Sequence, residues 1–273
     1  MRKYFFFLFI FICSVVFAEP LKLTFKIDED YLIIHILQFS EKRIQYYKSE
    51  YVDDLQSFKK ELSANCTLQE KAFIQKVYTE LFTYLQLPDL KKCSEFSSVI
   101  EKAKKTKAYP ILLQQTQKYL EGVEEQWKRN FEKTYQIMTD LTNLHFEGNY
   151  TVYITHPGLA NGLSLGNNII EWGGAEVEKN WSTFYLWHEI MHTYLHGGIE
   201  HAILQFVTDC ELRKHLNNTV YPPFLGHKHL MSLMKDIYPY WMDYLHSEEK
   251  DIMQFTNAMK KLFPEEEYFE TAP

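Results

Sequence analysis

One short segment combines the residue types that can hold and use a catalytic metal. His188, Glu189 and His192 form the pattern His-Glu-x-x-His within the uncharged surroundings of Trp187, Ile190 and Met191. On a helix, residues four apart lie on one face, so both imidazoles can bind a single zinc ion. Glu189 lies on the same side and can reach a water on that metal without binding the metal itself. The pattern therefore predicts a catalytic zinc site with Glu189 as general base.

A catalytic zinc site needs a third protein ligand and leaves one position open for water. We expect this ligand to be Glu211, which eighteen residues (193–210) separate from His192. The glycines at 197–198 allow a second helix to fold back across the first, which would deliver the Glu211 carboxylate to the two imidazoles. Glu200 and Asp209 are the alternative ligands.

Two further alternatives concern the same region. Glu211 can instead form a surface ion pair with His215 or Arg213. His196 continues the four-residue step, but its ring would lie two helical turns, roughly 12 Å along the axis, from His188. We therefore expect His196 to flank the site or support it from outside.

The run Trp187–His192, together with Glu211, resembles the zincin metallopeptidases, specifically the gluzincins. Its spacing is similar to that of the zinc aminopeptidases of this group. The resemblance covers about Thr151 to His215. It implies a zincin-like core with a mixed sheet, whose edge strand binds an extended peptide beside the metal helix. Asn168–Trp172 is the expected edge strand.

The sequence also departs from the aminopeptidases. Their Gly-x-Met-Glu-Asn segment, which grips a free amino terminus, is absent before the motif, and Gly166–Glu171 differs from it. An endopeptidase is therefore equally allowed. A metzincin would need Gly at Leu195 and His at Gly198, so that group is excluded.

The resemblance also implies a Tyr or His after the third ligand that stabilises the oxyanion formed during peptide hydrolysis. We select His229 from the residues that qualify by position, which are His227, His229, Tyr238, Tyr240 and Tyr244.

The elements around the motif follow from periodicity and from Gly and Pro signals. The predicted strands are Leu21–Ile27, Thr151–Thr155, Gly162–Leu165 and Asn168–Trp172. The predicted helices fill about 28–146, including Ile111–Leu144, then Phe184–His196 with Ser182 or Thr183 as N-cap, Glu200–Leu216, and two or three within Phe224–Phe263. This order predicts a mostly helical α+β fold. We expect a helical region at 19–147, the catalytic core at 148–220 and a C-terminal helical region at 221–273.

The first residues have the layout of a secretory signal peptide. Arg2 and Lys3 precede the apolar run Phe5–Phe17, and Val16 and Ala18 occupy the small-residue positions. We expect cleavage after residue 18 and a secreted or periplasmic protein. An uncleaved anchor is one alternative, and a lipoprotein modified at Cys13 is a weaker one.

The amino-acid composition and net charge limit the classes of molecule that this protein is expected to bind. A hydrophobic content of 46% and an aromatic content of 16% indicate a packed globule. Removing Arg2 and Lys3 with residues 1–18 reduces the 29 Lys and Arg to 27 against 36 Asp and Glu, a net charge of −9. This charge disfavours nucleic acid and anionic membranes as partners. We expect a peptide or protein substrate.

The cysteines that remain after residue 18 are Cys66, Cys93 and Cys210. In an oxidising compartment Cys66 and Cys93 can pair, which would leave Cys210 as a small buried residue.

Together these features predict a zinc metallopeptidase with one zinc per chain. The first alternative is a catalytically silent zincin-fold protein that binds or supports other molecules. The second is a metal-free helical protein.

Overall fold

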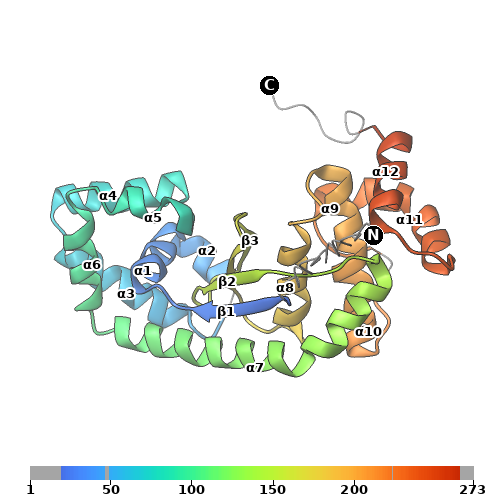
Figure 1. The fold of residues 1–273 in the computed structure, drawn as a ribbon. Helices are drawn as coiled ribbons and strands as arrows, with labels where there is room; N and C mark the ends of the chain where they lie inside the picture. Colours follow the sequence, from blue (N-terminus) through green and yellow to red (C-terminus); the bar gives the residue numbers. More distant parts are fainter. Residues whose placement is uncertain (1–19, 47–48, 223, 265–273) are drawn as a thin grey trace, which may run out of the picture.

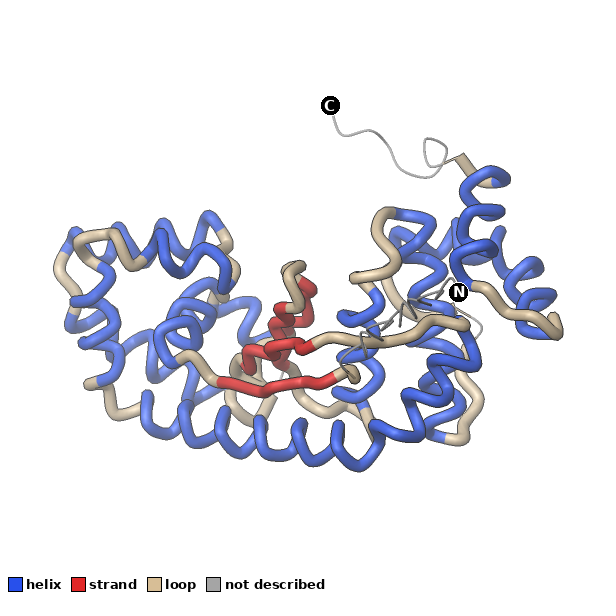
Figure 2. The backbone as a smooth tube through the Cα atoms, viewed as in Figure 1, coloured by secondary structure: helices blue, strands red, loops and turns tan. Residues whose placement is uncertain are grey.

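The computed structural model describes residues 20–46, 49–222 and 224–264. Helices dominate and surround one small sheet, which confirms the predicted α+β class (Figure 2). The predicted signal peptide at 1–18 lies outside the described residues.

Short helices form the first part of the fold, on the left of Figure 1. They enclose their own core, to which Ile33, Phe58 and Val99 contribute fully buried side chains. The elements are α1 (Glu29–Gln38), α2 (Glu41–Tyr46), α3 (Val52–Asn65), α4 (Leu68–Glu80), the 3₁₀ helix η1 (Tyr84–Gln86), α5 (Leu87–Leu90) and α6 (Phe96–Lys104).

The long helix α7 (Tyr109–Thr142) runs below both these helices and the sheet (Figure 1). The prediction of one helix over Ile111–Leu144 is confirmed. Leu112 near its start packs into the first core, whereas Trp127 and Met138 belong to a second core under the sheet and the later helices. Helix α7 therefore joins the two cores.

The sheet contains β1 (Lys22–Lys26), β2 (Asn149–Ile154), β3 (Asn161–Ser164) and β4 (Ile169–Gly173) in the order β1-β2-β4-β3. All four predicted strands are confirmed. The pairs β1/β2 and β2/β4 are parallel, and β3 is antiparallel to β4.

The prediction that Asn168–Trp172 forms the edge strand was wrong. The expected strand at 168–172 is β4, and it lies between β2 and β3, because its start pairs with β2 through the bond from Thr151 N to Asn168 O (2.9 Å). Asn167 and Asn168 both adopt positive φ, and the chain reverses there to place β3 outside β4. The edge strand beside the helix of His188 is therefore β3.

The remaining helices pack against the second core. They are α8 (Trp181–Met191), α9 (Gly198–Gln205), the π-helical segment η2 (Phe206–Leu212), α10 (Arg213–Asn217), the 3₁₀ helix η3 (Lys228–Leu230), α11 (Met231–His246) and α12 (Ile252–Leu262). The single helix predicted at 200–216 is thus three consecutive pieces, and the middle piece is not α-helical.

Helix α8 begins and ends earlier than predicted. Its N-cap is Asn180, with φ of 62°, so Ser182 and Thr183 lie in the first turn. Thr183 instead donates its backbone N–H to Gln126 Oε1 of α7 (2.8 Å). A tighter turn at 191–194 then ends the helix, so His196 lies beyond it.

A buried carboxylate links the first helices to the sheet. Glu171 of β4 accepts hydrogen bonds from the backbone N–H of Tyr84 (2.5 Å) and from Asn161 Nδ2 of β3 (3.1 Å). The Tyr84 ring stacks on Tyr153 of β2 with 3.5 Å between centroids. Because Asn161 opens β3, the first helices also help to position the edge strand.

Two smaller findings complete the fold. Cys66 and Cys93 are free thiols, so the Cys66–Cys93 disulfide considered above is not formed, while the expected burial of Cys210 is confirmed. Among the described residues, no helix has the length and apolar character needed to cross a bilayer.

Candidate metal centre

Helix α8 presents its two histidines to α9 because its apolar residues anchor the opposite side. Trp187, Ile190 and Met191 are fully buried, and Trp187 Nε1 donates a hydrogen bond to Thr134 of α7 (2.8 Å). The centroids of the His188 and His192 rings are 5.1 Å apart. The expectation that these two imidazoles share one face is confirmed.

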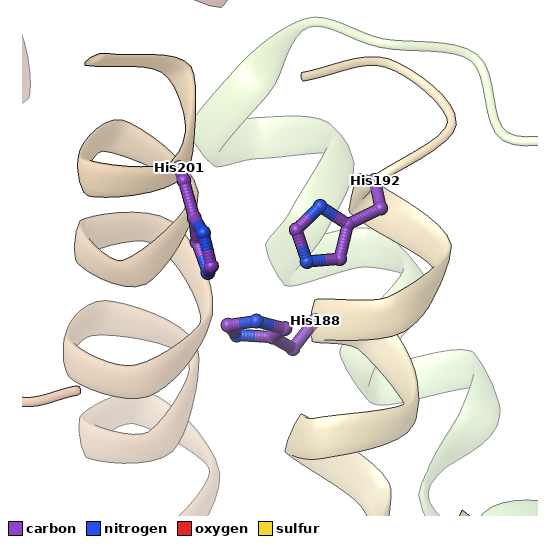
Figure 3. A group of neighbouring side chains, drawn as sticks. All are labelled: His188, His192 and His201. Atoms are coloured by element: carbon purple, nitrogen blue, oxygen red, sulfur yellow. The ribbon is translucent and has the colours of Figure 1, made fainter. Parts of the chain in front are cut away.

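The third member of the group is His201 of α9. One potential ligand atom each from His188, His192 and His201 lies within 4.8 Å of the others. Figure 3 shows the three imidazoles pointing toward one another, two from α8 and one from α9. These three side chains can hold a metal ion.

The chemical state of the rings fits this role. His201 Nε2 is buried and has no hydrogen-bond partner among the described residues. Burial lowers the pKa of His201 to about 3 and that of His192 to about 4. Both rings are therefore neutral near pH 7, which is the form that binds metals. An unpaired buried nitrogen is costly unless something binds it, and a metal ion would do so.

Asp209 lies behind His188 rather than in the group. Its Oδ1 is 3.0 Å from His188 Nδ1, and it also accepts a hydrogen bond from Thr208 Oγ1 (2.9 Å). Burial alone lowers the pKa of His188, but the Asp209 carboxylate holds it above the usual value. Since a carboxylate only accepts, His188 carries its proton on Nδ1 and turns Nε2 toward the other imidazoles.

The structure does not bring Glu211 into the group. Its carboxylate pairs with Lys214 (3.2 Å) and His215 (3.7 Å), the ion-pair role considered as an alternative. The other alternative ligand, Glu200, pairs with Lys260 of α12 (2.7 Å).

The π-helical segment explains these positions. Its hydrogen bonds join residues five apart, so it turns less per residue than an α-helix. Each residue after Gln205 is rotated back from its α-helical position. This rotation moves Asp209 toward the face that carries His201 and moves Glu211 toward the opposite face.

Glu189 lies between the histidines and the edge strand. It is only 4% exposed, and a Cβ added at Gly162 of β3 would lie 3.0 Å from its Oε1. Burial raises the pKa of Glu189 to about 7, although a hydrogen bond from the Ser164 backbone opposes this shift. A carboxylate with such a pKa can both accept and release a proton near neutral pH.

Of the expected oxyanion-stabilising candidates, His227 lies nearest to the group. Its ring centroid is 4.8 Å from that of His201 and 6.4 Å from that of His188. His229 is one step further out, with its ring 5.5 Å from that of His227.

The three tyrosine candidates have other surroundings. Tyr238 packs against Phe206, Tyr244 donates its hydroxyl to the Leu141 carbonyl (2.7 Å), and Tyr240 is exposed beside Phe263.

The segment that carries His227 is held by the helix of His201. Gln205, one turn after His201, accepts a hydrogen bond from the His227 backbone N–H (3.3 Å). Gly226 has φ of +123°, and a Cβ there would lie 2.3 Å from the Gln205 amide. Only glycine therefore allows this approach.

A cavity of about 600 Å³ opens beside Glu189 and His188. Residues from the loop before β3, from β3 and β4, from α8 and from 225–227 form its walls. Glu189, Asn161, Gly162 and His227 all face this space. A molecule in this cavity would thus contact the Glu189 carboxylate and the edge strand β3.

Comparison with known proteins identifies no relative: no family model matches the chain, and neither a curated protein nor a solved structure matches it.

Proposed function

We propose that this chain is a zinc-dependent peptidase. The observation that carries the proposal is the convergence of His188, His192 and His201 beside the buried Glu189, at the wall of a cavity. Three imidazoles with an open fourth position are a ligand set used by catalytic zinc. His201 replaces Glu211 as the proposed third ligand, and the gluzincin resemblance remains part of the proposal only for the His-Glu-x-x-His helix.

Zinc bound in such a site supplies a water of lowered pKa and polarises the substrate carbonyl. Glu189 takes a proton from the attacking water and passes it to the leaving amine nitrogen. His227, in place of His229, donates an N–H to the developing oxyanion. The roles of Glu189 and His227 require only their side-chain chemistry and the positions described above.

An extended peptide fits the edge strand. β3 is the last strand of the sheet, and its residues Gly162 and Ser164 adjoin the Glu189 carboxylate. A peptide that pairs with the free edge of β3 would place its backbone beside Glu189. Export by way of residues 1–18 belongs to the same proposal and rests on the sequence alone.

The test compares the wild type with Glu189→Gln on a mixture of unrelated peptides, with products identified by mass spectrometry and zinc measured in both proteins. Loss of the general base should reduce hydrolysis by about 10²–10⁴-fold and leave zinc bound. Glu132→Gln, at an exposed position of α7, is the control and should cleave like wild type.

Two results would overturn the proposal. The first is a wild-type rate in Glu189→Gln at equal zinc content, which would refute the role of Glu189 as general base. The second is that the wild type with full zinc occupancy cleaves no peptide, which would favour the catalytically silent protein.

A further inference from the structure

Aromatic side chains dominate one wall of the cavity beside Glu189. The rings of Trp172 and Tyr185 stack with 5.7 Å between centroids, and Trp181 packs against Tyr185 at 4.6 Å. Val177 and Leu225 extend this apolar lining. Such a wall offers a large, rigid contact area to another apolar group.

Small residues and backbone also line the cavity next to the aromatic rings, chiefly Gly158, Ala160 and Gly162. A Cβ added at Gly162 would lie 2.9 Å from the Trp172 ring, so a side chain here would intrude on the aromatic wall. The resulting space of about 600 Å³ lies within the usual range for ligand pockets. It can hold a large side chain beside the peptide backbone.

Apart from Glu189, the charged groups of the lining already have partners. Arg213 bonds to Glu178 and lies over the Tyr221 ring at 4.2 Å. Asp209 bonds to His188. A charged side chain that entered the cavity would lose water without gaining a free partner among these groups, which is unfavourable.

We infer that the cavity is a specificity pocket for a large aromatic or aliphatic side chain directly beside the scissile bond. This inference rests on the proposed peptidase function, because Glu189 and His188 lie at the same cavity. It names the substrate class as peptides that carry such a residue next to the cleaved bond.

The first experiment maps the cleavage sites of wild type in a peptide library. Sites should be enriched in Phe, Tyr, Trp or Leu at one position flanking the cut. Val177→Asp adds a carboxylate to the lining at a residue that is 67% exposed, so the fold should tolerate it. We expect kcat/KM for a phenylalanine-containing peptide to fall about tenfold or more, with a relative gain beside Lys or Arg.

Val220→Asp is the matched control. It makes the same substitution at a valine that is 90% exposed and lies outside the cavity lining. Its cleavage profile should equal that of wild type. Equal losses in both variants would overturn the inference, as would wild-type cleavage without apolar enrichment at either flanking position.

A second experiment does not need turnover. N-acetylphenylalaninamide is titrated into the Glu189→Gln protein, and the total tryptophan fluorescence is measured. Trp172 and Trp181 line the cavity, so binding there should change this signal. Saturable binding that Val177→Asp weakens and Val220→Asp leaves unchanged supports the pocket.

The two experiments separate the possible failures. If wild type cleaves peptides without apolar preference and the probe does not bind, the specificity inference is refuted, whereas the proposed peptidase function stands. Probe binding with no cleavage by zinc-loaded wild type overturns the peptidase and leaves an apolar binding site.

Discussion

His188 differs from the other two imidazoles because Asp209 holds its Nδ1 at 3.0 Å. This contact fixes both the orientation of the ring and the nitrogen that faces the other two imidazoles. His192 and His201 have no comparable carboxylate partner among the described residues. Asp209 should therefore tune metal affinity without touching the metal.

We predict that Asp209→Asn weakens zinc binding by about 10–100-fold. The amide keeps the shape of the side chain but lacks the charge that favours the Nδ1-protonated ring. Competition with a chelator of known affinity measures the effect. Asp243→Asn, on the exposed side of α11, should bind zinc like wild type, and unchanged affinity in Asp209→Asn would contradict this role.

The two histidines of the 224–230 region can be distinguished by kinetics. His227→Ala should lower kcat while zinc content and KM change little, because an oxyanion donor acts mainly in the transition state. His229→Ala is the matched control, since its ring lies beyond that of His227. A larger loss of kcat in His229→Ala than in His227→Ala would restore the sequence-based choice.

At the scale of elements, residue spacing correctly predicts which side chains of α8 lie together, but it does not predict this for the next helix. His188 lies in α8 and His192 is its C-cap, whose N–H still bonds to the His188 carbonyl (3.3 Å), so a four-residue step places both rings reliably. Between His201 and the pair Asp209 and Glu211, the helix changes from α to π. No residue pattern in the sequence predicts that change. The prediction of one unbroken α-helix over 200–216 places Glu211 too close to the site and does not include His201 among the ligands.

The sheet shows the same limit. Alternation and turn residues located all four strands, because these signals are local. The order of β3 and β4 depends on which strand pairs with β2, and that pairing is a long-range contact. The edge position of β3 could therefore not be read from the strand sequences alone.

The glycines give an element-scale prediction. Gly226→Ala should lower stability and kcat together, because φ of +123° and the contact with Gln205 both exclude a side chain. Gly122→Ala, in the middle of α7 with open space around it, should instead raise the free energy of unfolding by about 0.5–1 kcal/mol. Urea unfolding measures both, and a destabilised Gly122→Ala would contradict the helix-propensity argument.

At the scale of the molecule, α7 and Glu171 join the first helices to the part that carries the metal group. His156 and His35 lie near this junction. His156 accepts a hydrogen bond from the Gly158 backbone (3.0 Å), and His35 Nδ1 has no partner among the described residues. Burial lowers the pKa of each to about 3.

These histidines should make the fold sensitive to acid. Below the unfolded-state pKa of about 6.5, the unfolded chain takes up protons that the folded chain does not, so stability falls as pH decreases toward 3. Each buried histidine contributes a slope of up to about 1.4 kcal/mol per pH unit in this range. Above pH 7 its contribution is constant.

His35→Phe tests this prediction, because the ring lies between Tyr31 and Phe39 and an aromatic replacement suits that space. Urea unfolding at pH 7.5, 5.5 and 4.5, with chelator present in every sample, compares the variant with wild type. The variant should lose less stability on acidification. Parallel pH dependence in both proteins would show that His35 does not remain neutral in the fold.

Elemental analysis of wild type, His201→Ala and Glu211→Ala, purified side by side, tests the metal centre most directly. We predict about one zinc per chain in wild type and in Glu211→Ala, and a strong loss in His201→Ala, because only the latter removes a ligand. Zinc retained by His201→Ala and lost by Glu211→Ala would contradict the assignment and return the third ligand to Glu211.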